Sequence, residues 1–380
     1  MSRRAIRRIT KLGYAYIAKP LLFRQRPDMV HHNLISVSKF IQHIPGLRSV
    51  PRMWRHDASI LSQDIAGVHF INPIGLSAGF DKNIDMPYIM RNVGFGFMIG
   101  GSVTAMSSEG NPKPWFYRLP KTKSLVVFAG LPNKGVDYIA SRLGKLPAWL
   151  FNDFPLSISV AKTNMQENVS DDVAIKDYCR SLKVLEDQNL GQMYEINISC
   201  PNTYGGEPFT TPQRLNALLA EVDRLKLSKP VFIKMPIDKS WAKFRMLLDV
   251  IVVHNVQGVT IANLLKDRTK AILSDELPDA VQGNLSGLPT QQLSTELVRK
   301  TYQAYGDRLV IIGVGGVMNA EDAYKKIKSG ASLVALITGM IFEGPQLIGD
   351  INYNLERLLK EDGYVSIDEA VGVDVATKGV

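Results

Sequence analysis

The chain has 380 residues, of which 45% are hydrophobic, and a formal net charge of +9. This length and composition indicate a globular protein with one large core or two smaller ones. Its two cysteines, Cys179 and Cys200, are too few for a disulfide framework. No run approaches the roughly 18 apolar residues of a membrane span, and no signal-peptide core is found, which argues against a secreted or membrane-spanning protein.

The N-terminal segment mixes basic and apolar residues, and eight Lys and Arg residues precede the first acid, Asp28. We expect residues 1–60 to form a basic helical extension that docks peripherally on an anionic membrane surface. An organellar presequence and a basic helix packed on the protein body are alternatives. The charge alone would suit nucleic acid, but no recognition motif accompanies it, so no nucleic-acid partner is expected.

From about residue 65, short apolar runs alternate with amphipathic stretches, a pattern typical of buried parallel strands and covering helices. The predicted strands are 73–78, 97–104, 156–161, 193–199, 231–235, 258–263, 309–314 and 333–338. The predicted helices include 171–186, 212–225, 241–254, 291–305, 320–329 and 346–361. Eight such units predict an α/β fold, a (β/α)₈ TIM barrel over residues 61–380. Residues 105–131 are expected to form a long active-site loop.

Polar residues follow the predicted strands, where barrel enzymes place their chemistry. Asp81 and Lys82 follow the first strand, Asn263 ends the sixth, and glycines at 313–316 and 339 follow the last two. Glycines at these places let backbone N–H groups approach an anion, so they predict a phosphate site. A structural role in tight turns is the alternative for each glycine cluster.

Residues 197–203, Asn-Ile-Ser-Cys-Pro-Asn-Thr, place a thiol between two carboxamides after the fourth strand. Carboxamides both donate and accept hydrogen bonds, and a thiol can transfer a proton. A loop turning on Pro201 around an inert cysteine is the alternative. Lys234 lies inside an apolar strand and needs a partner there, either a phosphate cofactor, an electron-rich ring or an acid such as Asp238.

Together these motifs resemble the dihydroorotate dehydrogenase family, the flavin enzymes of pyrimidine biosynthesis. The resemblance runs from about residue 20 to 375 and rests on residues 75–82, 110–114, 116–119, 197–203, 284–287, 311–316 and 330–334. The N-terminal extension and residues 361–364 resemble the membrane-associated, quinone-using class 2. Class 2 members usually carry a serine base, whereas Cys200 is similar to the class 1 residue.

The resemblance implies FMN across the barrel mouth and dihydroorotate as the substrate, oxidised to orotate, with quinone as the acceptor and no metal. Cys200 would remove the C5 proton while hydride passes to the flavin, and its lower reference pKa should make it a better base than serine near neutral pH. The implied substrate contacts are Lys82, Asn197, Asn202 and Asn263. The implied cofactor contacts are Ala78, Gly79, Lys82, Ser102, Ser159, Asn197, Lys234, Gly287, Gly316, Ile337 and Thr338.

Some positions depart from the family pattern. Val127 replaces a substrate-contacting asparagine, and Ser159 and Ala262 replace two cofactor contacts, whereas His31 matches a family histidine. Ile71 and Ile337 stand where class 2 members usually carry Arg or Lys and Tyr near the quinone. Another substrate for the same frame, or a weak flavin-binding paralogue, is therefore the alternative. The expected location is the cytoplasmic side of the cell membrane, or else the cytoplasm, as a monomer or homodimer.

Overall fold

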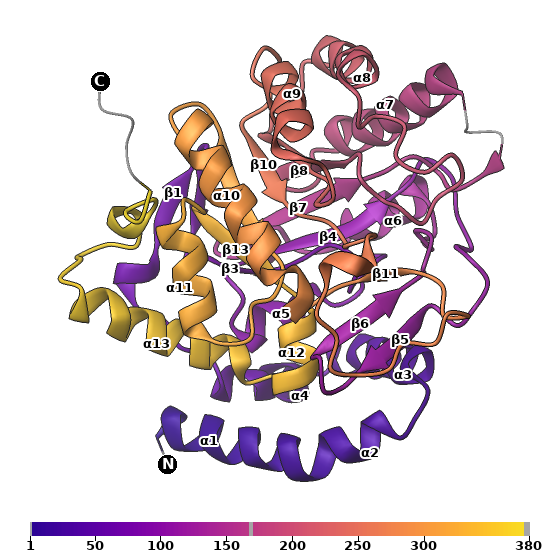
Figure 1. Cartoon of the computed structure of the whole chain (residues 1–380). Helices are drawn as coiled ribbons and strands as arrows, with labels where there is room; N and C mark the ends of the chain where they lie inside the picture. The colour runs from indigo at the N-terminus through magenta and orange to yellow at the C-terminus, as the bar shows by residue number, and fades with distance from the viewer. Residues whose placement is uncertain (1, 167–169, 376–380) are drawn as a thin grey trace.

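The computed structural model describes residues 2–166 and 170–375, and its centre is a closed barrel of eight parallel strands (Figure 1). The strands follow one another around the barrel as β10–β12–β13–β3–β4–β7–β8–β9. Their bounds are β3 Ile74–Leu76, β4 Phe97–Val103, β7 Leu156–Val160, β8 Met193–Asn197, β9 Val231–Lys234, β10 Gly258–Ile261, β12 Val310–Val314 and β13 Leu333–Leu336. Each overlaps one predicted strand, which confirms the predicted barrel.

Helices surround the barrel and bury one apolar face each (Figure 1). They are α5 Pro87–Val93, α6 Val136–Leu143, α7 Asp171–Asp187, α8 Pro212–Arg224, α9 Trp241–Ile251, α10 Gln291–Tyr305, α11 Ala320–Lys328, α12 Thr338–Glu343 and α13 Leu347–Glu361. Short 3₁₀ turns span Val50–Met53, Ser59–Leu61, Ala148–Phe151, Arg268–Lys270, Leu288–Thr290 and Asp368–Ala370. The predicted helix 241–254 is three residues too long, because its buried face ends at Ile251 and Val253 is exposed.

A hairpin that the sequence did not suggest closes the N-terminal end of the barrel. Strands β1 (Gln63–Ile65) and β2 (Val68–Phe70) pair in an antiparallel manner around Ala66 and Gly67, which both have positive φ. This backbone matches the two-residue turns that join adjacent strands. The Phe70 ring packs edge to face on Phe97 at 5.5 Å and belongs to the apolar cluster inside the barrel. Ligands can therefore be expected only at the opposite end, the barrel mouth.

Residues 105–131 are not the predicted loop throughout, because they contain the antiparallel strands β5 (Phe116–Leu119) and β6 (Ser124–Val127). The short strand β11 (Asn284–Leu285) adds to β6 and forms a three-stranded sheet. The aromatic and β-branched residues of this segment favour strands. The third strand, β11, lies far along the chain, so the sequence alone did not reveal the complete sheet.

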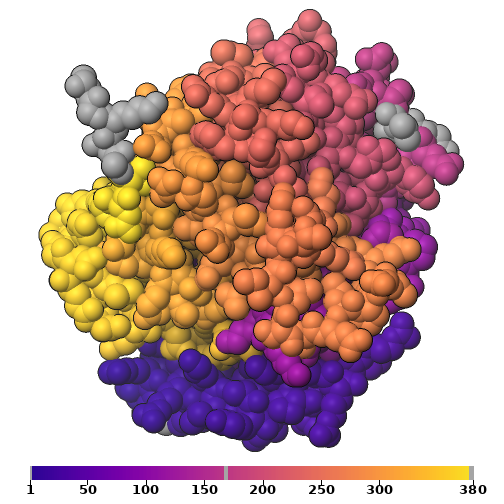
Figure 2. All heavy atoms as spheres, in the orientation of Figure 1, coloured from indigo at the N-terminus to yellow at the C-terminus, as the bar shows by residue number. Residues whose placement is uncertain are grey.

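The N-terminal helices lie along one edge of the molecule and form its lower border in Figures 1 and 2. Their bounds are α1 Arg3–Gly13, a π-helical segment Tyr14–Ala18, α2 Lys19–Phe23, α3 Pro27–Ile41 and α4 Pro45–Ser49. The buried Arg7 donates to Asp350 of α13 at 2.9 Å, and the Tyr14 hydroxyl donates to the Ile341 carbonyl at 2.6 Å. Within the described ranges, no helix combines the length and apolarity that crossing a membrane requires.

Candidate active site

A cavity of about 240 Å³ opens at the barrel mouth, where the strands end. It brings together all but one of the predicted site residues. Those that line it are Ala78, Gly79, Lys82, Ser102, Asn197, Cys200, Asn202, Lys234, Asn263, Gly287, Gly316, Ile337 and Thr338. Ser159 does not line the cavity but lies behind Ser102, with the two hydroxyl oxygens 2.8 Å apart. A direct cofactor contact through Ser159 is therefore not supported.

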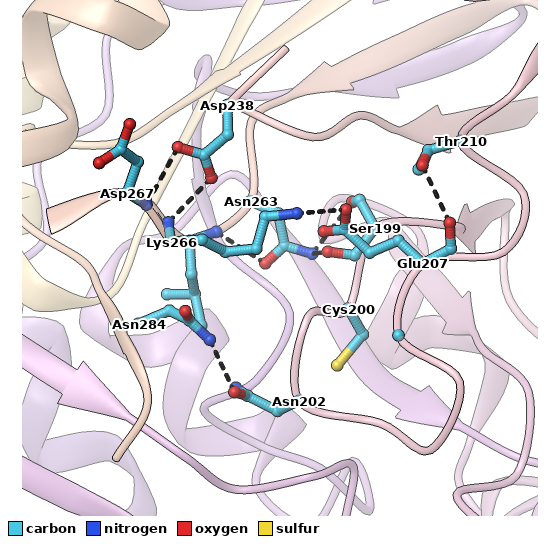
Figure 3. A network of polar contacts seen from close by, with 12 residues as sticks. Ser199, Cys200, Asn202, Glu207, Thr210, Asp238, Asn263, Lys266, Asp267 and Asn284 are labelled. Atoms are coloured by element: carbon cyan, nitrogen blue, oxygen red, sulfur yellow. Dashed lines mark hydrogen bonds and ion pairs between the residues drawn. The ribbon is translucent and has the colours of Figure 1, made fainter. Parts of the chain in front are cut away.

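The loop after β8 carries Cys200 and is tied to the sheet above the mouth (Figure 3). The Asn202 side-chain amide donates to the Val127 carbonyl at 3.0 Å, and its oxygen accepts from Asn284 at 2.7 Å. The buried Lys162 holds the same loop from behind, donating to the Tyr204 carbonyl at 2.6 Å. Because both flanks of Cys200 are anchored, its thiol is held at the cavity wall.

Burial raises the pKa of the Cys200 thiol to about 11, although the backbone N–H of Asn202 and the lysines Lys234 and Lys162 act to lower it. The carboxylate of Glu207 adds to the increase. Near neutral pH the thiol is therefore mainly protonated, and the comparison with a serine base stays a prediction that rests on reference pKa values. The reference pKa of a free cysteine does not include the loss of water around the thiol.

Asn197 at the end of β8 and Asn263 after β10 form a shared network across the intervening strand β9. Asn197 donates to Ser102 Oγ at 2.9 Å. Asn263 donates to the Ser199 carbonyl at 2.8 Å (Figure 3). Each carboxamide has two N–H donors and an oxygen with two lone pairs. The contacts within the protein fix the orientation of both side chains and leave capacity for a ligand in the cavity.

Lys82 reaches the cavity wall next to the N-terminal helix α3. Its Nζ lies 3.4 Å from His31 Nε2 and 5.3 Å from the centre of the Phe116 ring. Burial lowers the pKa of Lys82 to about 8 and that of His31 to about 3, so near neutral pH the imidazole is neutral and the amine is cationic. An anionic group of a ligand would find a largely desolvated cation here.

A glycine cradle forms one end of the cavity and fits a bound phosphate. Gly287 and Gly316 have φ of +76° and +71°, and an added Cβ would clash with the Lys123 carbonyl and the Gln291 side chain respectively. The backbone is thus exposed to the cavity without side chains. Beside it, the hydroxyls of Ser286 and Thr338 lie 3.0 Å apart.

Lys234, deeper in the cavity, is only 5% exposed, and its side-chain ammonium group has no hydrogen-bond or ion-pair partner among the described residues. The alternative partner Asp238 instead accepts from the backbone of Lys266 and Asp267. The register of β8 and β9 places Lys234 beside Asn197. Glu195 precedes Asn197 by two residues on β8, and its buried carboxylate oxygens also have no hydrogen-bond partner within the described chain. A buried cation facing an open cavity fits an electron-rich ring, so both ends of the site fit FMN.

The departures from the family pattern fall in different places. The Val127 side chain lines the cavity, with Asn284 directly opposite on β11. Ala262 and Ile337 also line it. Ile71 does not, because it follows β2 at the closed end of the barrel, so its suggested place near a quinone is wrong.

Two features of the site escaped the sequence reasoning. Arg118 lines the cavity on its α3 side and donates to the Gln25 carbonyl at 2.7 Å. The motif at residues 116–119 predicts family membership but not this place in the site. Glu207 pairs with Lys266 at 2.6 Å and links the Cys200 loop to the segment after β10 (Figure 3). No spacing in the sequence signals this pair, because 59 residues separate its members.

A (β/α)₈ barrel with lysines, asparagines and a cysteine gathered in a cavity at its mouth has the architecture of a barrel enzyme. Comparison with known proteins identifies the family. A family model described as dihydroorotate dehydrogenase matches residues 60–359. The dihydroorotate dehydrogenase (quinone) of Nostoc punctiforme is 32% identical over 96% of this chain and 99% of its own length. That of Haloarcula marismortui is 34% identical over 94% and 99%. The chain belongs to the dihydroorotate dehydrogenase family.

A solved structure, the ligand-free DHODH of Eimeria tenella, matches with a TM-score of 0.77 at 26% identity and covers 87% of this chain and 99% of its own. The likeness thus extends through most of the barrel and its surrounding helices. Members of this family are generally flavin-dependent.

Proposed function

We propose that this protein oxidises dihydroorotate to orotate in pyrimidine biosynthesis, with FMN as cofactor and a quinone as electron acceptor. The observation that carries the proposal is the meeting of Cys200, three asparagines, Lys82 and Lys234 in one cavity at the barrel mouth. The relatives that match almost the whole chain bear the name of this activity, with quinone as the acceptor.

FMN, when bound, accepts hydride from the substrate. Its phosphate suits the glycine cradle at Gly287 and Gly316, where backbone is exposed without side chains. Lys234 supplies a buried positive charge that would attract the electron-rich edge of the flavin ring. Asn197, fixed by Ser102, offers a directional hydrogen bond at the same level of the barrel as Lys234.

Dihydroorotate combines a carboxylate with ring amide groups, and the cavity offers a counterpart for each. Lys82 is the cation for the carboxylate, and at neutral pH it retains its proton because its pKa is about 8. Asn202 and Asn263 are already oriented by the protein, so binding does not require them to lose rotational freedom. Their remaining donors and lone pairs suit the ring amides.

Cys200 Sγ is the group that takes the C5 proton. The lysines Lys162 and Lys234 favour the thiolate, while burial and Glu207 oppose it. The anchored loop keeps Sγ at the cavity wall, and proton transfer needs such a position within hydrogen-bond reach.

The quinone would enter between the barrel and the N-terminal helices. The cavity is lined by Val30 and Leu34 of α3, and Leu34 is also 46% exposed, so the cavity reaches the surface there. The N-terminal segment also exposes many large apolar side chains: Ile9, Leu12, Tyr16, Ile17, Leu21, Met29, Val37, Phe40, Ile44, Leu47, Val50 and Met53. Exposed apolar residues that alternate with basic ones along these helices suit peripheral attachment to an anionic membrane. Residues 1–60 would be the docking extension and 61–380 the FMN barrel.

Anaerobic reduction tests the catalytic proposal. The purified protein should be yellow and should lose its flavin absorbance when dihydroorotate is added, and a quinone should restore the colour. Cys200→Ala should keep the flavin but lose most of the bleaching. A wild-type protein that stays yellow with dihydroorotate would refute the proposed substrate. Reoxidation by fumarate or a nicotinamide nucleotide instead of quinone would refute the proposed acceptor.

Vesicle sedimentation tests the membrane proposal. Ile17→Glu combined with Phe40→Glu places charges on two residues that are 65% and 69% exposed, so folding should be unaffected. This variant should no longer sediment with phosphatidylglycerol vesicles. Ile272→Glu, at a residue outside the N-terminal helices that is 92% exposed, is the matched control and should sediment like the wild type. Equal sedimentation of both variants would reject the docking surface.

A further inference from the structure

Lys326, on α11, is enclosed by the protein without an acidic partner. Its side chain is fully buried, and its Nζ donates to Ser294 Oγ at 2.6 Å and to Thr295 Oγ1 at 2.9 Å. No ion pair joins it to a carboxylate among the residues that the structure describes. Two hydroxyls satisfy its hydrogen bonds but do not balance its charge, and an enclosed cation without a counter-ion is unfavourable.

The Lys326 side chain packs directly behind the glycine turn that follows β12. A Cβ added to Gly313 would lie 3.3 Å from Lys326 Cδ. A Cβ added to Gly315 would lie 3.1 Å from Ser294 Oγ, the hydroxyl that accepts from Lys326. A single hydroxyl therefore separates the ammonium group from the backbone of the turn.

The first turn of α10 fills the space between Lys326 and the glycine cradle, and α10 and α11 lie side by side (Figure 1). Gln291 donates to the Gly316 carbonyl at 2.7 Å, and Thr290 donates to the Gly287 carbonyl at 2.8 Å. Both halves of the cradle are thus attached to the turn of α10 that also accepts from Lys326. The ammonium group and the cradle belong to one rigid unit.

We infer that Lys326 is a positioning residue whose buried charge is balanced by the phosphate of the bound flavin nucleotide. The inference rests on the proposed use of FMN and extends it to a residue that does not line the cavity. An anion in the cradle would be separated from the ammonium group by the α10 turn, in surroundings that water does not screen. The phosphate would then supply the counter-charge that the fold lacks.

The charges around Lys326 are consistent with this role. Burial lowers the pKa of Lys326 to about 7, Asp322 of the same helix acts to raise it, and Lys325 acts to lower it. From α10 the amine faces only the two hydroxyls, and from β12 it faces Gly313. Without a ligand the amine is therefore close to losing its proton, and an anion in the cradle would keep the proton in place.

The test compares FMN with riboflavin, which has the same ring and no phosphate. Full-length protein freed of its flavin is titrated with each, and binding is followed by quenching of flavin fluorescence. Lys326→Met removes the charge and keeps the length of the side chain, and Lys326→Gln is a second neutral variant in case the first does not fold. Lys325→Met, at an exposed position on the same helix, is the matched control.

Both Lys326 variants should bind FMN on the order of tenfold more weakly, because they lose a buried unit charge that attracts the phosphate. Their riboflavin affinity should be unchanged, and Lys325→Met should behave like the wild type. Equal losses for both flavins would show a merely structural role, and unchanged FMN affinity would also overturn the inference. Failure of the wild type to bind either flavin would instead overturn the proposed function, and the inference with it.

Discussion

The high pKa of Cys200 predicts how flavin reduction depends on pH. With a pKa of about 11, the thiolate is about one part in ten thousand of the free enzyme at neutral pH. Each pH unit below the pKa changes this fraction about tenfold, so the rate of reduction by dihydroorotate should rise about a hundredfold between pH 7 and 9. Anaerobic stopped-flow absorbance at saturating substrate measures this rate separately from reoxidation.

The carboxylate of Glu207 provides a matched pair of variants for the same experiment. Glu207→Gln removes a negative charge that raises the Cys200 pKa, so its profile should move to lower pH. Lys266→Met breaks the same 2.6 Å ion pair but leaves the carboxylate in place, so its profile should not move that way. A rate of reduction that is independent of pH between 7 and 9 would refute Cys200 as the base. Equal shifts of the pH profile in both variants would refute the effect of the Glu207 carboxylate on the Cys200 pKa.

Three further outcomes are expected. Orotate affinity, measured by perturbation of the flavin spectrum, should fall as the pH rises through about 8, where Lys82 loses its proton. Unchanged affinity up to pH 10 would contradict the role of Lys82 in binding the carboxylate. Arg7→Met should lower the free energy of unfolding in urea by about 3 kcal/mol because it leaves Asp350 without its partner, whereas the exposed Arg8→Met should have little effect. The flavin-free protein should become more stable as the pH rises from about 7 towards 10, because the folded-state pKa of Lys326 is below its unfolded value and the unfolded chain binds the extra proton. Lys326→Met should reduce that rise in thermal unfolding experiments and leave the part that Lys82 contributes, because the pKa of Lys82 is also lowered, to about 8.

The sequence was sufficient for the barrel because each buried strand is a continuous apolar run followed by an amphipathic helix. It also placed Cys200 and Lys234 correctly at strand ends, and the structure brings them into one cavity. It could not reveal contacts between distant segments, such as the pairing of Asn284 with Val127 across the mouth. It also assigned Cys200 the chemistry of a solvated thiol, since desolvation depends on how tightly the loop packs and not on residue type.

Because the hairpin closes one end of the barrel, residues there are constrained by stability, whereas residues at the mouth are constrained by ligand binding. Phe70 and Phe97 fill the closed end, far along the strands from any reacting group, so substitutions there alter only how firmly the barrel holds together. Substitutions at the barrel mouth, for example at Asn202 or Lys82, can change which ligand binds while the apolar residues at the closed end keep the barrel folded. The sequences at the two ends of the strands can therefore diverge independently, so the residues at the mouth can change without loss of the fold.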